Sequence, residues 1–234
     1  MRIISWNCSQ AFRKKWVRIA EMLPDIAVIQ ECESMEKLKK CYDPTFTNAL
    51  WFGDNPNKGI GIFSNHLYKL SIHPSYENRF HWVVPVLVSG VETFTIFIVW
   101  TKDHSDKKQS YIGQLYLALR QYESIFQNET CIVIGDWNSN AIWDRLPHVG
   151  NHTTVVNLLN DHGLISVYHT HFNELHGSET IPTYYLHYNQ NKGYHIDYAF
   201  IPSKWLDKLV DVSVGNYDLW RPVSDHVPLS LFLK

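Results

Sequence analysis

The sequence predicts an α/β domain in which mixed β-sheets are flanked by helices. Short runs rich in Ile, Val, Phe and Trp recur along the chain between turn residues, as strands do. Between some of these runs, apolar residues recur at the spacing of an amphipathic helix. Residues 77–100 contain two consecutive strand-like runs joined by a short turn at 89–92, which is typical of an antiparallel hairpin. The sheets are therefore expected to be mixed rather than purely parallel.

The predicted elements follow from these two periodicities. The predicted strands cover residues 2–6, 26–29, 59–63, 82–88, 94–100, 131–134, 195–201 and 229–233. The predicted helices cover residues 11–22, 110–126 and 153–162. In the first helix, Trp16, Ile19 and Leu23 share one face. The longest irregular stretches, 102–109 and 169–180, are candidate substrate loops.

Length and composition predict a single domain that spans residues 1–234. With 234 residues, 45% of them hydrophobic, the chain is long enough to bury one substantial core. Neither a run of about 18 apolar residues nor a signal-peptide pattern is present, so the expected location is cytoplasmic, with no membrane association and no obligate protein partner. The four cysteines lack C-x-x-C spacing and are expected to be reduced and mostly buried: Cys8, Cys32, Cys41 and Cys131.

Polar side chains stand at the ends of several predicted strands, where they leave the core and can converge on one edge of a sheet. They are Asn7 after the first strand, Glu31 after the second, the Gly-Asp-Trp-Asn group at 135–138, Asp197, and Ser-Asp-His at 224–226 before the last strand. All of them supply hydrogen-bond donors, acceptors or bases.

These residue types suit phosphate ester hydrolysis. A hard cation such as Mg²⁺ or Mn²⁺ takes oxygen ligands, so one or two carboxylates and a carboxamide suffice to hold it. The residues that meet this demand are Glu31, Asp225 and Asn7. Hydrolysis also needs a water to be oriented or deprotonated and the phosphoryl charge to be neutralised. The residues that can divide those tasks are His226 with an orienting carboxylate, and Asp136 with Asn138.

Each of these residues also has a plain structural explanation when it is taken alone. Gly-Asp-x-Asn is a common turn sequence, and a histidine before a strand is more often structural than catalytic. Asn7 can cap the helix that follows it, and Asp197 can be the buried partner of a histidine or a backbone amide. Their joint order along the chain is the informative observation.

That order resembles the endonuclease/exonuclease/phosphatase superfamily, which includes exonuclease III, deoxyribonuclease I, sphingomyelinases and inositol polyphosphate phosphatases. The matching features are an Asn that ends the first strand, Gln-Glu at the end of the second, Gly-Asp-x-Asn midway, an Ile-Asp-Tyr strand and a terminal Ser-Asp-His, and they span Asn7 to His226. The resemblance implies a deoxyribonuclease I-like four-layer sandwich: two mixed β-sheets face to face, helices outside, and a site at one edge where strand ends from both halves meet.

The resemblance also implies a role for each site residue. Glu31 is implied to be the main metal carboxylate, with Asn7 and Asp225 completing or supporting the metal shell. The group implied to position the water and the scissile phosphate and to take the proton comprises Asp136, Asn138, Asp197 and His226. Within it, Asp197 holds His226, and the choice of Asp136 or His226 as proton acceptor stays open.

One position departs from the family pattern. Family members often carry His or Tyr at the end of the strand before the long middle helix, where this chain has Trp100. An indole offers one N–H donor and no titratable proton. Either Trp100 takes that position, and phosphate stabilisation comes from the indole, Lys102, His104 or the metal, or Trp100 packs in the core.

Local composition bears on the substrate. The formal net charge of −2 means that nucleic acid binding needs a local basic patch rather than a global positive field. Basic clusters follow three proposed site residues, at 13–18, 37–40 and 102–108, and each of them can also be a solvated surface. The side chains predicted to bind substrate are Lys14, Lys15, Trp100, Lys102, Tyr184 and Tyr185, with Trp220 as a further stacking candidate.

The leading functional hypothesis is a metal-dependent nuclease that hydrolyses phosphodiester bonds with an activated water, with DNA favoured over RNA as the substrate. The alternative is a phosphatase or phosphodiesterase for nucleotides or other small phosphorylated molecules, which the mild net charge favours. A third hypothesis, a scaffold that has become a binding module, ranks lowest because the site positions other than Trp100 remain chemically competent.

Overall fold

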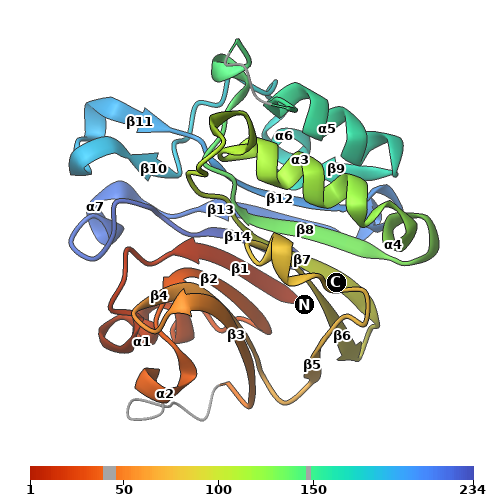
Figure 1. Ribbon diagram of the computed structural model, residues 1–234. Coiled ribbons are helices and arrows are strands. Elements are labelled where there is room, and N and C mark those ends of the chain that lie inside the picture. The colour runs from red at the N-terminus through yellow and green to blue at the C-terminus, as the bar shows by residue number, and fades with distance from the viewer. Residues whose placement is uncertain (39–45, 146–148) are drawn as a thin grey trace.

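The computed structural model describes residues 1–38, 46–145 and 149–234. Two β-sheets form its inner layers (Figure 1). The first sheet consists of β1 (Arg2–Asn7), β2 (Ile26–Cys32), β3 (Asn48–Asn55), β4 (Lys58–Ser64), β13 (Leu209–Val214) and β14 (Leu229–Leu233). The second consists of β5 (Tyr68–Ile72), β6 (Val83–Gly90), β7 (Phe94–Trp100), β8 (Cys131–Asp136), β9 (Leu164–Ser166) and β12 (Asp197–Pro202). A separate two-stranded ribbon pairs β10 (Tyr184–Tyr185) with β11 (Gly193–Tyr194).

Both sheets are mixed, as the sequence predicts. The first has the order β13-β14-β1-β2-β4-β3 and the second the order β5-β6-β7-β8-β12-β9. Each contains one parallel pair, β1 with β2 and β7 with β8, and its other neighbours are antiparallel. The predicted hairpin is confirmed, because β6 and β7 pair antiparallel across the turn that follows Gly90.

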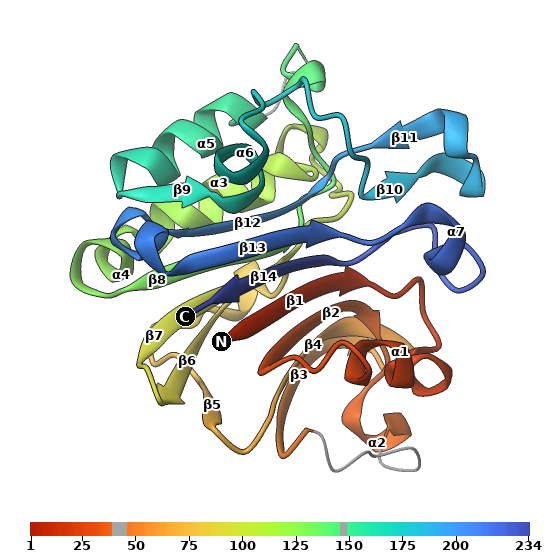
Figure 2. The ribbon, with the colours of Figure 1, turned by 180° about the vertical axis from the view of Figure 1, so that it is seen from behind.

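Helices cover the outer faces of the two sheets, so the molecule has four layers (Figures 1 and 2). One group lies over the first sheet: α1 (Trp16–Ala20) and α2 (Met35–Leu38). The other lies over the second sheet: α3 (Ile112–Gln121), α4 (Glu123–Asn128), α5 (His152–Asp161) and α6 (Val167–Phe172). A short helix, α7 (Tyr217–Trp220), lies near the ribbon at one end of the sandwich. Within the described residues, no helix has both the length and the apolar character needed to span a bilayer.

The central strands β1, β2, β7, β8 and β12 bury both of their faces, which explains why they read as nearly continuous apolar runs. On β1, Ile3 faces the core between the sheets, whereas Ile4 and Trp6 belong to the core under α1. On β8, Ile134 faces the first core and Val133 the core under α3 and α5. Each fully buried Ile or Val side chain stabilises the fold by roughly 1.5–3 kcal/mol relative to an exposed one.

The predicted segments match real elements, with differences at their ends. The helix expected at 11–22 is a 3₁₀ turn at Phe12–Lys14 followed by the single-turn α1, and the helix expected at 110–126 is divided into α3 and α4 at Tyr122. The irregular stretch expected at 169–180 begins inside α6. Strands β3, β5, β9 and β13 were not predicted. Cys8, Cys32 and Cys131 are buried free thiols, as expected, and Cys41 lies outside the described residues.

Candidate active site

Strand register brings the predicted catalytic residues together at one edge of the sandwich. In the second sheet, Asp136 at the end of β8 lies between Trp100 on β7 and Asp197 on β12. In the first sheet, Asn7 at the end of β1 lies opposite Gln30, one residue before Glu31. The two sheets meet where the side-chain amide of Asn7 donates a hydrogen bond to Oδ2 of Asp136 at 3.0 Å. The site therefore spans both halves of the sandwich.

Asp136 is held by amide donors. Its side chain is fully buried, and its Oδ1 accepts the backbone N–H of Asn138 at 2.9 Å. Its Oδ2 accepts the side-chain amides of Asn7 and Asn138, each at 3.0 Å. Asn138 adopts a left-handed backbone conformation with φ 47°, and its side chain also donates to the carbonyl of Thr101. This turn aims the Asn138 amide at the carboxylate and fixes the carboxylate in one orientation.

Gly135 lets β8 approach β7 closely just before Asp136. It has φ 146°, and a Cβ at this position would lie 2.0 Å from the carbonyl oxygen of Val99. Any other residue would push the two strands apart at the point where the Asp136 carboxylate is placed. The glycine of the Gly-Asp-x-Asn motif is thus required by packing.

His226 and Asp197 form a buried pair beside Asp136. Nδ1 of His226 lies 2.9 Å from Oδ2 of Asp197, and its Nε2 lies 4.0 Å from Oδ2 of Asp136. The His226 backbone is fixed as well, because its N–H donates to Ser224 and its carbonyl accepts the indole N–H of Trp6. The second oxygen of Asp197, Oδ1, is buried and has no hydrogen-bond partner among the described residues.

The pKa values of this group are linked. Burial and then the charge of Asp197 raise the pKa of Asp136 to about 7, against the lowering effects of His226, Asn7 and Asn138. Burial lowers the pKa of His226, but the charge and hydrogen bond of Asp197, and then other nearby carboxylates, outweigh it and raise the pKa to about 9. The environment thus gives the two groups different pKa values: Asp136 titrates near neutral pH, whereas His226 keeps its proton there.

Glu31 stands on an irregular residue at the end of β2. The pairing of β2 with β4 shifts register between Gln30 and Cys32, and Glu31 has a positive φ of 60°. Its side chain is 17% exposed, and its Oε1 lies 3.1 Å from Nζ of Lys58 at the start of β4. A non-glycine residue in this conformation is held there by its surroundings, and here the result is a carboxylate turned to the surface of the site.

Tyr184 and Asp225 close the other side of the site. Tyr184 forms an isolated β-bridge with His226, and the two rings lie 4.7 Å apart between centroids. Burial raises the pKa of Tyr184, and the charges of Asp225, Asp136 and Glu31 raise it further. Asp225 is half-buried, and its carbonyl accepts the backbone N–H of Tyr185.

Trp100 is 2% exposed and packs in the core between the sheets, so the core-packing alternative describes its position. It contacts Trp82 edge to face, with 5.0 Å between ring centroids. Nζ of Lys102 lies 3.9 Å from the ring centroid of Trp82 and 4.7 Å from that of Trp100, and Lys58 lies 5.2 Å from the latter. Two lysines are thus placed at the site by aromatic faces.

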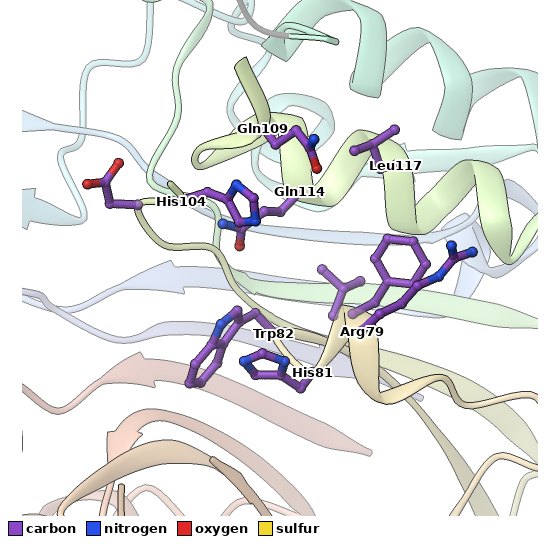
Figure 3. A pocket seen from close by; sticks show the side chains of 10 residues that line it. Arg79, His81, Trp82, His104, Gln109, Gln114 and Leu117 are labelled. Atoms are coloured by element: carbon purple, nitrogen blue, oxygen red, sulfur yellow. The ribbon is translucent and has the colours of Figure 1, made fainter. Parts of the chain in front are cut away.

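A cavity of about 140 Å³ adjoins this cationic rim (Figure 3). Its walls include Arg79, His81 and Trp82 on one side and His104 and Gln109 on the other, as Figure 3 shows. The cavity combines aromatic and basic side chains with one carboxylate, that of Asp103.

The other residues predicted to bind substrate differ in how exposed they are and in whether they already make contacts within the protein. Lys14 is exposed, whereas Nζ of Lys15 donates to the carbonyls of Cys8 and Ser9 and so braces the loop after Asn7. Tyr185 is 8% exposed and packs against Tyr217, as does Trp220 against Trp6. The predicted basic residues Lys39 and Lys40 lie outside the described residues.

Three residues of the site were missed by reasoning from the sequence. Lys58 pairs with Glu31, and the hydroxyl of Thr183 accepts the backbone N–H groups of Ile196 and Asp197. Glu33 is 1% exposed and pairs with Arg13. Their positions depend on strand pairing and loop contacts, although the turn residues directly before Lys58 were a signal that a strand starts there.

Solved structures of similar fold are found over the whole chain. An AP endonuclease from Archaeoglobus fulgidus has 17% identity and a TM-score of 0.71, with 100% of this chain and 99% of that chain covered. The 3' phosphatase NExo from Neisseria, bound to a product DNA hairpin, has 16% identity and a TM-score of 0.69, with 100% and 99% covered. The endonuclease domain of TRAS1, a telomere-specific non-LTR retrotransposon, has 17% identity and a TM-score of 0.66, with 100% and 97% covered.

The chain has the deoxyribonuclease I-like fold. The architecture that the resemblance implies is therefore confirmed: two mixed sheets face to face between helices, with polar strand ends gathered at one edge. No protein-family model matches the chain, and no curated protein matches it either.

The residues at the site edge of this deoxyribonuclease I-like fold fit a hard divalent cation. The donor set consists of carboxylate and carboxamide oxygens, the type that Mg²⁺ and Mn²⁺ prefer. Oδ1 of Asp197 is an orphaned buried acceptor, and Lys58 already places a cation against Glu31. Asp136, Asp197 and His226 also present ligand atoms within 4.8 Å of one another. The predicted ligands of the ion remain Asn7, Glu31 and Asp225.

Replacing Glu31 by Gln tests its predicted metal role. We expect the Mg²⁺ concentration at half-maximal activity to rise by about tenfold or more, because an amide oxygen lacks the charge that holds a hard cation. Activity at saturating Mg²⁺ should fall far less. A titration of activity against Mg²⁺ measures both quantities, with Glu36→Gln on α2 as the matched control. An unchanged Mg²⁺ requirement in Glu31→Gln would remove Glu31 from the metal shell.

Proposed function

We propose that this protein is a divalent-metal-dependent phosphodiesterase, and most specifically a nuclease that hydrolyses DNA. The observation that carries the proposal is a group of four side chains from both sheets: Asn7 is hydrogen-bonded to Asp136, Asp197 to His226, and His226 lies 4.0 Å from Asp136, with a cationic rim beside them. This group contains a base, a held imidazole and amide donors, which are the parts that phosphoryl transfer to water needs. The likeness to structures of two DNA-acting nucleases and a 3' phosphatase supports it.

Asp136 takes the proton of the attacking water in the proposed mechanism. Its carboxylate is fixed by amide donors from Asn7 and Asn138, so it is oriented before the substrate arrives. A pKa of about 7 makes it a stronger base than an ordinary aspartate and leaves a substantial ionised fraction at neutral pH. The water oxygen then forms the new bond to phosphorus, and the bond to the leaving oxygen breaks.

His226 neutralises charge on the phosphoryl group. Its Nδ1 is held by Asp197, and this fixes the direction of the Nε2–H bond. The Nε2 atom lies 4.0 Å from Oδ2 of Asp136. With a pKa of about 9 the imidazole is protonated at neutral pH, so it donates to a phosphoryl oxygen and does not compete for the proton of the water. We therefore propose Asp136, rather than His226, as the acceptor of the water proton.

A divalent cation, when bound by Glu31, Asn7 and Asp225, supplies further neutralisation of the phosphoryl charge. Asn138 adds a side-chain amide next to Asp136, and Tyr184 covers His226 from the solvent side. The chain's own residues thus orient and deprotonate the attacking water and keep bulk water out of the site.

DNA is the proposed substrate because cations and aromatic faces lie beside the catalytic group. Lys58 and Lys102 stand on the Trp82–Trp100 pair, and the adjoining cavity adds Arg79 and other basic side chains. A backbone with several phosphates uses such a rim, whereas a small ester fills only the catalytic group.

Salt dependence separates the two substrate classes. We expect kcat/KM for a labelled DNA duplex to fall steeply between low and physiological salt, because each neutralised phosphate releases counterions. A small ester such as bis-p-nitrophenyl phosphate should show a shallow dependence. Efficient, salt-insensitive hydrolysis of the small ester or of a mononucleotide, with every oligonucleotide left intact, would replace the proposal with the small-molecule phosphatase alternative.

Removing both rim lysines should weaken nucleic acid binding, and because Lys58 also pairs with Glu31, the Mg²⁺ requirement of the double variant is measured as well. We expect Lys58→Ala with Lys102→Ala to raise KM for DNA by about tenfold or more and to reduce the salt slope by about 2, one for each lost phosphate contact. Fluorescence anisotropy with a labelled duplex over a salt series measures the slope. Lys69→Ala is the control, since Lys69 is exposed on β5 at the other end of the second sheet. Equal slopes in the double variant and the control would place the DNA elsewhere.

A further inference from the structure

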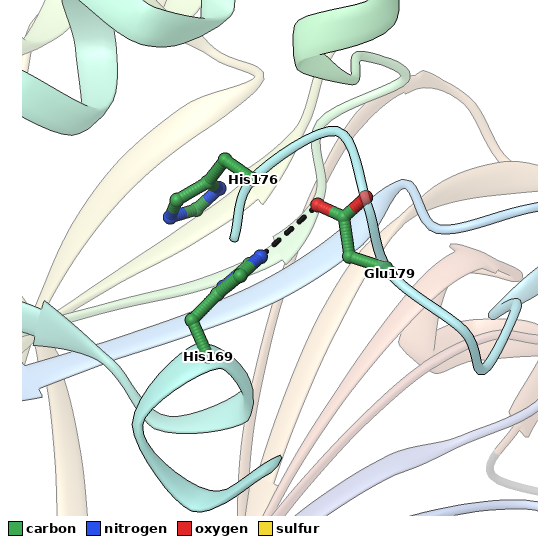
Figure 4. Close-up of side chains that lie close together, drawn as sticks. All are labelled: His169, His176 and Glu179. Carbon is green, nitrogen blue, oxygen red and sulfur yellow. Dashed lines mark hydrogen bonds and ion pairs between the residues drawn. The ribbon is translucent and has the colours of Figure 1, made fainter. Parts of the chain in front are cut away.

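A second cluster of ligand-type side chains lies outside the candidate active site. His169 on α6, and His176 and Glu179 in the loop that follows, present ligand atoms within 4.8 Å of one another. Figure 4 shows the Nε2 side of the His169 ring directed at the Glu179 carboxylate, with the His176 ring beside it. The separation of Nε2 of His169 from Oε1 of Glu179 is 3.0 Å.

These side chains are largely withdrawn from solvent. The side chains of His169 and Glu179 are 9% and 3% exposed. The Glu179 carboxylate is also anchored from behind, because Oε2 accepts the side-chain amide of Asn140 and both oxygens accept the backbone N–H of Gly177. A buried carboxylate that faces an imidazole and is held in one orientation by other donors can bind a cation without first having to be reoriented.

Two more histidines, His152 and His195, lie beside the cluster. Nε2 of His152 lies 3.0 Å from Nδ1 of His176, and the side chain of His152 is fully buried. Among the described residues, Nδ1 of His152 and Nε2 of His195 have no hydrogen-bond partner, although both atoms are buried. Unpaired buried polar atoms are rare in folded proteins, and those that occur often serve a bound ion or an ordered water.

The donor chemistry selects the class of ion. Two imidazoles and one carboxylate are ligands of zinc and similar divalent transition metals, whereas Mg²⁺ and Ca²⁺ prefer oxygen alone. Metal–ligand bonds of about 2.0–2.2 Å require ligand atoms roughly 3.4 Å apart in a tetrahedron, which is close to the separation of His169 and Glu179. The rings of His169 and His176 are stacked 3.5 Å apart between centroids at 23°, so side-chain rotation must open them before both nitrogens reach one ion.

We propose that His169, His176 and Glu179 bind a divalent transition metal ion of the zinc class, with a water completing the tetrahedron. His152 acts as the outer partner of His176, because a hydrogen bond to the second ring nitrogen fixes the tautomer and orientation of a ligating histidine. The site is separate from the catalytic group and does not depend on the proposed nuclease function.

The role of this ion is to stabilise the strand ends that carry the catalytic carboxylates. The Asn140 amide nitrogen lies 3.0 Å from Oε2 of Glu179, 2.9 Å from the carbonyl oxygen of His195 and 3.2 Å from the hydroxyl of Tyr198, so its two hydrogens are shared among these three acceptors. Asn140 follows β8, which ends at Asp136. Tyr198 follows Asp197 on β12, and His195 lies two residues before Asp197. An ion at Glu179 therefore joins the loop after α6 to both strands.

Metal content and cobalt absorption test this proposal. Protein produced with zinc in the medium and passed through a desalting column is expected to retain about one equivalent of zinc, measured by inductively coupled plasma mass spectrometry. After zinc removal, added Co²⁺ should give the intense visible bands of a tetrahedral site. His171→Ala, which changes an exposed histidine of the same helix, should behave like the wild type, and His176→Ala should lose both signals.

Two further variants ensure that the experiment can be interpreted. Glu179→Gln serves if His176→Ala does not fold, and circular dichroism checks each variant. Cobalt spectra are also recorded for Glu31→Gln, so that an ion at the catalytic group is not counted. Absence of zinc in the wild type, or equal zinc content and equal cobalt spectra in wild type and His176→Ala, would overturn the proposal; the cluster would then be a hydrogen-bonded network only. Metal content and cobalt spectra do not measure DNA cleavage, so either result leaves the proposed nuclease function to its own test.

Discussion

Replacing Asp136 by Asn is expected to lower kcat for DNA cleavage by about 10³- to 10⁴-fold, near the upper range for the loss of a general base. The substitution keeps the size of a fully buried side chain but removes the group that accepts the proton. It also places a third side-chain amide against those of Asn7 and Asn138, so that at least one of the present hydrogen bonds becomes a donor–donor contact. Single-turnover kinetics at saturating metal measures the chemical step directly.

This experiment has two controls: a matched variant and a measurement of folding. Asp211→Asn is the matched control, because Asp211 is an exposed aspartate on β13 away from the site edge. Thermal unfolding of Asp136→Asn shows whether lost activity reflects lost folding. If the folded variant kept kcat within a factor of about ten, Asp136 would not be the base and the proposed mechanism would be wrong.

His226→Ala is expected to lower kcat by about 10²- to 10⁴-fold, because one charged donor to the phosphoryl oxygens disappears. The loss should appear in kcat more than in KM, since the imidazolium matters most when charge develops in the transition state. Asp197→Asn should have a smaller effect of the same kind, because Asp197 orients His226 through Nδ1 and does not touch the substrate. Steady-state kinetics of the three proteins separates these effects.

The pair should also behave as a unit. Because Asp197 acts through His226, the double variant should be hardly slower than His226→Ala alone. Alanine at 226 leaves the buried Asp197 carboxylate without its partner, which costs several kcal/mol, so His226→Asn is measured beside it as a less disruptive variant. Additive effects of the two substitutions would show that Asp197 works independently of His226.

The structure brings together four motif residues that the sequence placed at or near strand ends. Asn7, Asp136, Asp197 and His226 are joined by hydrogen bonds or short contacts, although they are far apart in the chain. They were recognisable because each closes or opens an apolar run, and parallel pairs such as β1 with β2 and β7 with β8 bring strand ends to one edge. The fold followed from the same runs.

The sequence predicted less where a role depends on pairing between distant segments. Lys58 opposes Glu31 only because β4 pairs antiparallel with β2, and strands β3 and β5 were missed because their apolar residues are interrupted by polar and exposed ones. Lys15 was expected to bind substrate, but its hold on the Cys8 and Ser9 carbonyls could not be seen without the loop conformation. Histidines 169 and 176 looked like loop residues in the sequence, and their contact with Glu179 arises from tertiary packing.

Cleavage of defined nucleic acids tests the central claim most directly. Labelled single-stranded DNA, duplex DNA, duplex with an abasic site and RNA are incubated with the wild type in Mg²⁺, Mn²⁺ or EDTA, beside Asp136→Asn. We expect cleavage of at least one DNA substrate that needs the metal and is lost in the variant, and the product ladder then separates endonuclease from exonuclease action. Intact substrates under every condition, or cleavage that persists in EDTA or in Asp136→Asn, would contradict a metal-dependent nuclease centred on Asp136.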